Sequence, residues 1–288
     1  MNKNLTRTLP SISTLRHVQF SRKGVPFLKT STVQAKLTTD LLASKSYLAL
    51  PKRAARPAAA SQPFPPPTLL TMEFEPVFTL GRRDRVALTP AERDRLLGTG
   101  ARVYETLRGG QTTFHGPGQM TGYVVIDLVQ HKLKPRCYVA LLEDAMMETC
   151  AHYGVATVKT ENTGVWVRRG GGGEGGGAVE ESKIGAVGVH MRRNVTSYGV
   201  ALNVTTDLRW FDLIVPCGLE GKGTTSLERE GVRGVGVVEV AAVFAEIMRK
   251  KLGCESIESL NEWRLFEWIE GRTIQTLASG KITDFAAI

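Results

Sequence analysis

Apolar residues recur every three to four positions in three parts of the chain, which is typical of amphipathic helices. These segments are residues 25–46, 136–153 and 237–252. Glycine directly follows the second and the third, and glycine is the residue that most often ends a helix. A shorter helix is predicted after Thr89-Pro90-Ala91-Glu92, because threonine and glutamate at this spacing form a capping box and proline suits the first helical position.

Runs rich in β-branched and aromatic residues lie between these helices and predict strands. They occur at residues 68–81, 101–107, 121–128, 164–168, 183–191 and 197–204. Strands interleaved with helices predict an α/β or α+β domain with a mixed sheet. The chain has 288 residues, of which 42% are hydrophobic, and this is enough for a substantial core. No apolar stretch approaches the length of a membrane span, so no membrane partner is expected.

Two segments of biased composition interrupt the pattern. Residues 51–67, PKRAARPAAASQPFPPP, predict a linker, because their prolines prevent regular helix and strand. Residues 169–177, RGGGGEGGG, are interpreted as a flexible surface insertion. This glycine run formally contains GxGxxG, but it opens no helix and therefore does not predict a dinucleotide site. An RNA-binding interpretation is also weak, since glutamates follow the run.

Charge is distributed very unevenly along the chain. Residues 1–72 hold eleven of the 37 Lys and Arg residues and one of the 28 acidic residues, which gives them a charge of +10. The rest of the chain carries −1, so the net charge is +9. The basicity therefore does not indicate a nucleic-acid-binding domain. A start that is free of acids and contains arginine and serine predicts an organelle transit segment, for which a basic tail of a cytosolic protein is the alternative.

The four cysteines, Cys137, Cys150, Cys217 and Cys254, lie far apart without CxxC spacing or a companion histidine. This arrangement predicts neither a metal site nor a disulfide framework, and thiols in a reducing compartment are expected. Cys137 and Cys150 fall in a predicted helix and are expected to pack rather than react. Cys217 stands between proline and glycine at the end of an apolar run. On its own it would more often be a buried structural thiol, yet it is the preferred candidate nucleophile.

Two further segments combine unusual composition with polar side chains. Residues 108–122 are rich in glycine and proline, and Arg108, Gln111, His115 and Gln119 supply hydrogen-bonding groups. Such a backbone suits close approach to a ligand, although a solvated turn explains the composition equally well. Residues 183–190 are small and β-branched and begin with Lys183, whose charge matters only if a neighbouring group benefits from a cation.

Together these segments resemble the lipoyl(octanoyl) transferase family of the eukaryotic mitochondrial type. The matching motifs are RGGQTTFHGPGQMTGYVVIDL (108–128), KIGAVGVHMRR (183–193), YGVALNV (198–204) and DL…F…LIVPCGLEG…TSL (207–227), with FTLGRR (78–83) upstream and LRH (15–17) as the first strand. The resemblance covers most of residues 15–250. It implies a catalytic domain over 15–260 that contains the two biased segments, a transit segment over 1–14 and a C-terminal extension over 261–288.

The resemblance also implies the fold of biotin and lipoate protein ligases, a mixed sheet with helices on one side and an acyl tunnel. The implied activity is transfer of an octanoyl group from octanoyl-acyl carrier protein to a lysine of lipoyl domains or of the glycine cleavage H protein, in the mitochondrial matrix and without a cofactor. Cys217 would be the nucleophile and Lys183 its partner. The residues implied to line the acyl site are Arg108, Gly109, Gly110, Gln111, Thr112, Thr113, Phe114, His115, Ala186, Val187, Gly188, Gly199, Val200 and Ala201.

General chemistry agrees with these implied roles. A thiolate is populated at neutral pH when a cation such as Lys183 is near, and exchange between two thioesters needs no nucleotide. Small residues on the strands are expected to leave room for an acyl chain. Burial of about seven carbons at ~0.8 kcal/mol each would contribute roughly 5–6 kcal/mol to binding.

Two other functions are considered for this sequence. An ATP-dependent lipoate or biotin protein ligase would share the fold, but it needs no catalytic cysteine, and the Pro-Cys-Gly element therefore disfavours it. A non-catalytic protein that binds acyl carriers or lipoyl domains is disfavoured because both Cys217 and Lys183 are present.

Overall fold

The computed structural model describes residues 12–20, 23–49, 64–84, 88–170, 179–214 and 222–262. Cys217 lies outside the described residues. So do the first eleven residues of the predicted transit segment, most of the Pro/Ala linker, nearly all of the glycine-rich insertion and most of the C-terminal extension.

The predicted helices form at nearly the expected bounds. The helices of the described residues are α1 (Phe27–Ala49), α2 (Pro90–Leu97), α3 (Pro135–His152), α4 (Val237–Lys251) and the 3₁₀ helix η2 (Leu208–Leu213). The capping box before α2 is confirmed, since Glu92 N–H donates to the Thr89 hydroxyl and Thr89 N–H donates to the Glu92 carboxylate. No helix in the described part of the chain combines the length and apolar character that a membrane crossing needs.

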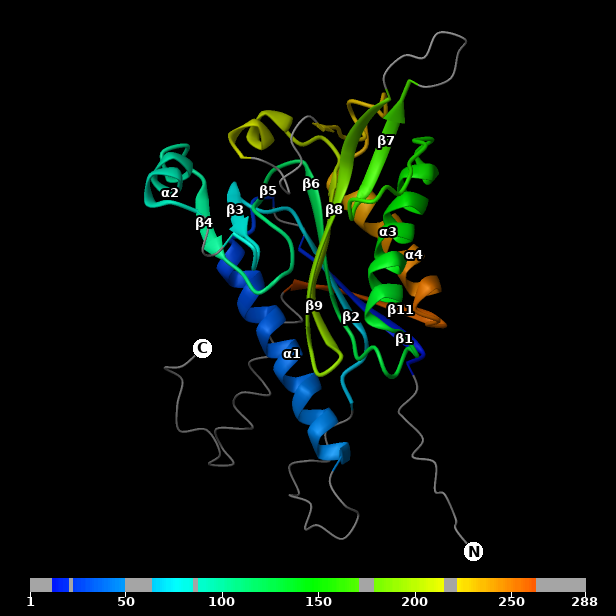
Figure 1. The fold of residues 1–288 in the computed structure, drawn as a ribbon. Coiled ribbons are helices and arrows are strands. Elements are labelled where there is room, and N and C mark those ends of the chain that lie inside the picture. Colours follow the sequence, from blue (N-terminus) through cyan, green and yellow to red (C-terminus); the bar gives the residue numbers. More distant parts are fainter. Residues whose placement is uncertain are drawn as a thin grey trace, which may run out of the picture.

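A large mixed sheet forms the centre of the molecule (Figure 1). Among the described residues its strands follow the order β10-β8-β9-β6-β2-β1-β11, and β7 pairs with β8 as well. The bounds are β1 (Thr14–Gln19), β2 (Thr68–Met72), β6 (Gln119–Val125), β7 (Val165–Arg169), β8 (Glu180–Arg192), β9 (Val195–Asn203), β10 (Gly223–Thr224) and β11 (Ser256–Asn261). β1 pairs in parallel with both β2 and β11, whereas β6, β8 and β9 are antiparallel neighbours, so the predicted mixed sheet is confirmed.

Helices cover both faces of this sheet, whereas the resemblance implied helices on one side only. α3 and α4 pack over a core that includes Leu69 and Val124, and α1 packs on the other face over Leu70 and Val125. The strands β2 and β6 are buried along their whole length, so each face presents apolar side chains that need a cover. α1 supplies the second cover, as Figure 1 shows.

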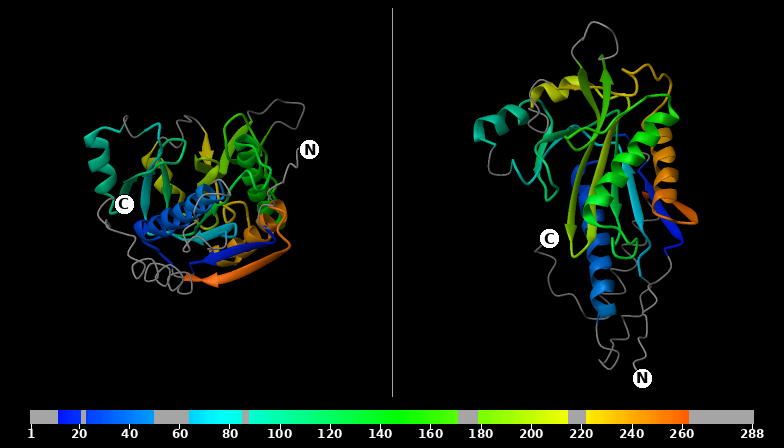
Figure 2. Two further views of the ribbon diagram at one scale, coloured as in Figure 1. Left: turned by 90° about the horizontal axis from the view of Figure 1, so that it is seen from below. Right: turned by 45° about the vertical axis from the view of Figure 1, so that its right-hand side comes forward.

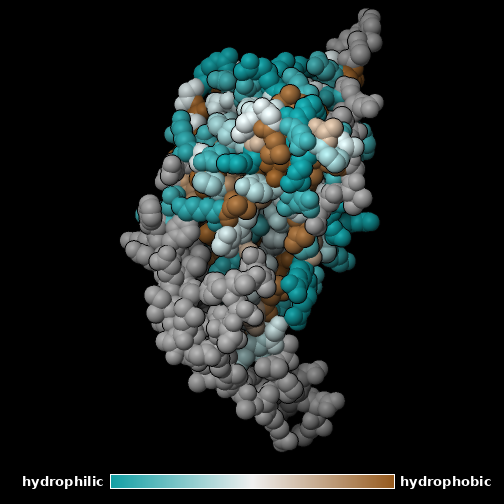
Figure 3. Space-filling model, turned by 90° about the vertical axis from the view of Figure 1, so that its left-hand side faces the viewer, coloured by the Kyte–Doolittle hydropathy of each residue, from teal (hydrophilic) through white to brown (hydrophobic). Residues whose placement is uncertain are grey.

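A smaller sheet stands beside the large one and carries α2 (Figure 2). It consists of β4 (Arg102–Glu105), β3 (Val77–Leu80) and β5 (Thr113–His115), in that order. The run 68–81, predicted as one strand-rich segment, is therefore divided between two sheets, because the chain turns at residues 73–76, which include Pro76. Figure 3 shows a face on which several hydrophobic patches lie among hydrophilic residues.

Two cysteines of α3 differ in their environment. Cys150 is buried in the core beneath α3 and α4, as expected, and burial raises the pKa of its thiol to about 12. Cys137 is exposed near the start of the helix, so the expectation that it packs in the core is wrong. The first three residues of α3 are exposed, and the helical period places one cysteine outward and the other inward.

We expect Leu37→Ala to reduce the free energy of unfolding by about 2–5 kcal/mol, because it opens a cavity between α1 and the sheet. Leu28→Ala on the same helix should change it by less than about 0.5 kcal/mol. The side chain of Leu37 is 2% exposed and that of Leu28 is 56% exposed. Urea titration of both variants measures the difference, and equal effects would show that α1 does not cover this face.

Candidate active site

Strand β8 brings together the segments that the sequence singled out. The glycine-rich loop within residues 108–122 contacts β8 where the Gly109 N–H donates to the Val189 carbonyl at 2.9 Å. The chain after Cys217 joins it through β10, and the Thr225 N–H donates to the Lys183 carbonyl at 2.9 Å. β9 pairs along the remaining length, with Ala186 opposite Ala201 and Gly188 opposite Gly199. All four motifs therefore meet along one strand.

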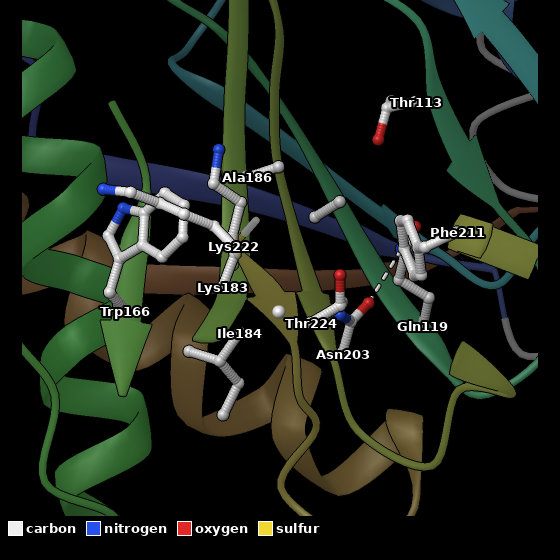
Figure 4. A pocket seen from close by; sticks show the side chains of 13 residues that line it. Thr113, Gln119, Trp166, Lys183, Ile184, Ala186, Asn203, Phe211, Lys222 and Thr224 are labelled. Atoms are coloured by element: carbon white, nitrogen blue, oxygen red, sulfur yellow. Dashed lines mark hydrogen bonds between the residues drawn. The ribbon is translucent and has the colours of Figure 1, made fainter. Parts of the chain in front are cut away.

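Three adjoining cavities lie along these segments, and Ala186 contributes to the wall of each. The first cavity extends from Lys183 to Phe211, and Figure 4 shows its lining side chains. The second continues from Thr113 and Ala201 to Arg108 and contains most of the predicted acyl-site residues. The third, of about 360 Å³, is bordered by Gly109, Gly188 and Lys183. Lys183 therefore lies where the first and the third cavities meet.

A hydrogen-bond network centred on Gln119 connects four segments at the wall of these cavities. Its amide oxygen accepts from His115 Nδ1 at 2.7 Å, and its amide nitrogen donates to the Asn203 side-chain oxygen at 3.0 Å (Figure 4 shows the second bond). Asn203 in turn donates to the Thr225 carbonyl at 2.9 Å. The network fixes β5, β6 and β9 relative to the chain that follows β10, so the cavity wall is rigidly held.

His115 is a neutral buried side chain. Burial, and next the positive charge of Arg108, lower the pKa of His115 to about 4, although the hydrogen bond to Gln119 opposes this shift. Because Gln119 uses its amide nitrogen for Asn203, its oxygen can only accept, and His115 Nδ1 must carry the hydrogen. His115 thus acts as a positioning group of fixed tautomer at neutral pH.

Arg108 is buried beside the second cavity. Its guanidinium donates to the Thr79 carbonyl and to the Thr79 hydroxyl on β3, and also to the Gly109 carbonyl. The same side chain lies over Gly188, where an added Cβ would be 3.0 Å from the Arg108 Cδ. Arg108 therefore connects the small sheet with β8 and forms one end of the site.

The sequence led us to expect that the small residues on the strands leave space for an acyl chain. Only some of them do so. The position of a Cβ on Gly188 is occupied by Arg108, and a Cβ on Gly199 would lie 2.2 Å from the Gly122 carbonyl oxygen. These two glycines allow close contacts within the protein. Ala186 and Ala201 are the small residues that line the wall shared by the first two cavities.

Two of the predicted acyl-site side chains have other contacts. Thr112 donates to the Asp84 carboxylate through both its N–H and its hydroxyl. Phe114 is fully buried in the core of the small sheet, where its ring stacks on Trp210 with centroids 4.8 Å apart. Neither borders the three cavities. Along the chain they alternate with Thr113 and His115, which line the second cavity.

Two lysines border the first cavity, and they differ in their partners. Lys222, five residues after Cys217, donates to Glu181 at 2.8 Å and to Glu161 at 3.1 Å, and these hydrogen bonds raise its pKa. Lys183 donates to the Thr163 carbonyl at 3.1 Å and makes no ion pair with any of the described residues. Of the two ammonium groups, Lys183 is therefore the one that no carboxylate in the described part of the chain neutralises.

Several cavity residues were not singled out from the sequence. Their side chains come from every part of the site: Tyr123, Trp166, Tyr198, Asn203, Phe211, Lys222 and Thr224. All but Trp166 lie within the matching motifs, Tyr123 in 108–128, Tyr198 and Asn203 in 198–204, and Phe211, Lys222 and Thr224 in 207–227, but none was predicted individually as a site residue. The described residues contain no group of three or more His, Cys, Asp or Glu side chains that could hold a metal ion.

The sequence of the chain matches a known family of proteins. A family described as the lipoyl protein ligase A/B catalytic domain matches residues 48–249. The chain belongs to this family. It is 32% identical to the mitochondrial octanoyltransferase of Saccharomyces cerevisiae over 304 residues, which covers 90% of this chain and 88% of the yeast protein. The resemblance noted in the sequence is thus confirmed.

Two other similarities support the assignment and the fold. The human protein named octanoyl-[acyl-carrier-protein]:protein N-octanoyltransferase, mitochondrial, is 42% identical over 192 residues, 66% of this chain and 77% of the human one. The crystal structure of lipoate-protein ligase A bound with ATP has a TM-score of 0.54 at 14% identity, covering 91% of this chain and 94% of the other. The ligase-like fold predicted for this member of the family is therefore confirmed.

The neutral state of His115 predicts a pH dependence of stability. Its folded-state pKa of about 4 lies below the ordinary value of 6.5, so between these values the unfolded chain binds a proton that the folded chain does not. Stability therefore falls as pH decreases from 6.5 to about 4. We expect His115→Gln to reduce this dependence by about 1.4 kcal/mol per pH unit.

Denaturant titrations across this pH range measure the slope for wild type and variant. Some slope should remain in the variant, because burial also lowers the pKa of His17 to about 4. An unchanged slope in His115→Gln would contradict the neutral assignment of His115.

Proposed function

We propose that this chain is an octanoyltransferase that moves an octanoyl group from octanoyl-acyl carrier protein, through a thioester on Cys217, to the lysine of a lipoyl domain or of the glycine cleavage H protein. The observation that carries the proposal is Lys183, an ammonium group without a carboxylate partner in the described residues, at the junction of cavities built from all four motifs. Family membership and the printed names of the relatives support the same activity.

The first half-reaction forms the acyl-enzyme. The Cys217 thiolate attacks the carbonyl carbon of the donor thioester, and a new C–S bond forms as the bond to the carrier sulfur breaks. The carrier thiolate leaves and takes up one proton, which Lys183 can donate. A cation beside a thiol favours its ionised form, so Lys183 would act on both the nucleophile and the leaving group.

The second half-reaction releases the product. The lone pair of the acceptor amine attacks the acyl-enzyme carbonyl, the amide C–N bond forms, and the bond to Cys217 breaks. The amine loses one proton, which Lys183 takes back, so the proton count balances over the two steps. Lys222 is poorly suited to this exchange because two carboxylates hold its proton.

The acyl chain would lie in the first two cavities, along the wall shared by Ala186 and Ala201. The third cavity, which opens beside Lys183, would admit the thioester of the donor or the amine of the acceptor. The Gln119 network supports this arrangement because it holds the cavity wall against the chain that follows Cys217.

The mitochondrial matrix is the proposed location. The basic, acid-free start of the chain supports it, and so do the names of the yeast and human relatives, which both include the word mitochondrial. An ATP-dependent ligase is the second candidate, because the fold is shared with a ligase that binds ATP. That similarity is at 14% identity, whereas the relatives named octanoyltransferases are 32% and 42% identical.

Mixing the protein with octanoyl carrier protein in the absence of ATP should give a covalent octanoyl adduct in intact mass spectrometry. Cys217→Ser should give no adduct and less than about a tenth of the wild-type transfer, because serine is not appreciably ionised near neutral pH. Cys137→Ser, at an exposed thiol, is the matched control and should retain the adduct. An adduct that persists in Cys217→Ser, or transfer that requires ATP, would refute the mechanism.

Lys183→Met should slow alkylation of Cys217 by iodoacetamide at neutral pH and move its pH midpoint toward the ordinary thiol value of about 8.5. Lys183→Arg keeps the charge but cannot readily exchange a proton, so alkylation should be largely retained while transfer is lost. Peptide mass spectrometry measures both, with exposed Cys137 as the internal reference.

Lys251→Met is the control, since Lys251 forms an ion pair with Glu148 between α3 and α4, outside the three cavities. It should leave alkylation and transfer unchanged. If Lys183→Met leaves the pH profile of Cys217 alkylation unmoved, the two residues are not a catalytic pair.

A further inference from the structure

The pairing of β7 with β8 contains an irregularity beside Lys183. Val165 is opposite Gly185, but the next residue, Trp166, is opposite Lys183, so the register shifts by one position between Val165 and Trp166. Such bulges re-aim side chains relative to a regular strand pair. Here the shift places an indole and an ammonium group side by side, and the Lys183 Nζ lies over the Trp166 ring, 4.7 Å from its centroid.

The indole is held independently of the lysine. Its Nε1–H donates to the Asn162 carbonyl at 2.9 Å, and its backbone exchanges two hydrogen bonds with Val158. Trp166 is 1% exposed. The ring is therefore a fixed surface, and Figure 4 shows both Lys183 and Lys222 extending toward it.

The turn before Trp166 completes the surroundings of the lysine. Thr163 accepts a hydrogen bond from the Lys183 Nζ, and Gly164 follows with a φ of +127°. A Cβ on Gly164 would lie 2.6 Å from the Gly185 carbonyl oxygen and 3.1 Å from the Lys183 Cε, so only glycine allows the turn to lie this close to the lysine. The Gly164 N–H is fixed by the Glu143 carboxylate at 2.8 Å.

We propose that Trp166 is a positioning residue for Lys183, and that its ring face holds the ammonium group at the mouth of the acyl cavity through a cation–π contact. The inference rests on the proposed function, in which Lys183 exchanges protons with the thiol and the amine. An indole attracts a cation without taking its proton, whereas a carboxylate would neutralise its charge. The ring therefore fixes the place of the ammonium group while leaving its proton available.

Lys222 provides an internal comparison. Its Nζ lies 5.1 Å from the centroid of the same ring, but Glu161 and Glu181 hold it in place by ion pairs. Among the described residues, Lys183 has the Thr163 carbonyl and the ring as its partners and no carboxylate. Weakening the ring as a cation partner should therefore act mainly on Lys183.

The test replaces Trp166 alone, by site-specific incorporation, with tryptophans that carry an increasing number of fluorines on the indole. Fluorine withdraws electron density from the ring face and weakens the cation–π contact with little change in ring shape. We expect kcat for octanoyl transfer to fall stepwise, by about tenfold over the series. KM for the octanoyl carrier protein and the melting temperature should stay constant.

The same series at Trp210 is the matched control. Trp210 is a partly buried indole whose ring contacts are Phe114 and Phe78 rather than a lysine. Fluorination at this position should leave kcat unchanged. A flat kcat series at Trp166, or an equal decline at Trp210, would overturn the positioning role.

A second measurement does not depend on the reaction. An acetyl N-hydroxysuccinimide ester acetylates lysine side chains. The rate at Lys183, relative to that at Lys159, should rise with the number of fluorines on Trp166, because the weakened ring holds the Lys183 side chain less firmly. If this rate is constant, the contact has no energetic role and the inference is wrong whatever the activity. If the acetylation rate rises but neither the wild type nor any variant transfers the octanoyl group, the cation–π contact is supported and the proposed function is wrong.

Discussion

Backbone hydrogen bonding to β8 is the constraint on which the candidate site depends. The glycine-rich loop reaches it at Val189, β10 and Thr225 reach it at Lys183, β9 pairs with its second half, and β7 with its first. One strand thus assembles residues that are more than a hundred positions apart. The polar groups along it differ in charge state: His115 is buried and neutral, Lys222 is ion-paired, and Lys183 forms no ion pair with any residue that the structure describes.

Much of the fold follows from local pattern. The helix predicted over 237–252 forms at Val237–Lys251, where the apolar period coincides with the buried residues. The strand predicted over 183–191 forms at Glu180–Arg192, where small and β-branched residues predominate and burial is mostly partial. β11 was not predicted, since its residues are mostly exposed or half-buried and show no clear apolar alternation. Its conformation depends on pairing with β1, and β10, with two residues, depends in the same way on β8. Such strands are defined by their partners rather than by their sequence.

The site was only partly accessible from the sequence. The motifs identified Lys183, Arg108, His115 and Ala186, and the structure brings these segments together. Trp166 and Lys222 could not be found in the same way. The contact of Trp166 with Lys183 depends on a one-residue shift between two strands, and the role of Lys222 depends on glutamates 41 and 61 positions away. No local pattern encodes either relation.

The pairing of β1 with β11 has a consequence for how the domain is made. Thr14 and Ser256, whose hydroxyls are 2.8 Å apart, are separated by 242 positions, and β1 lies between β2 and β11. A nascent chain can therefore complete its central sheet only after residue 261 has left the ribosome, and until then β1 presents an open strand edge. Contacts of such high sequence separation slow folding, and β11, the edge strand, can join the sheet only as the last step of its assembly.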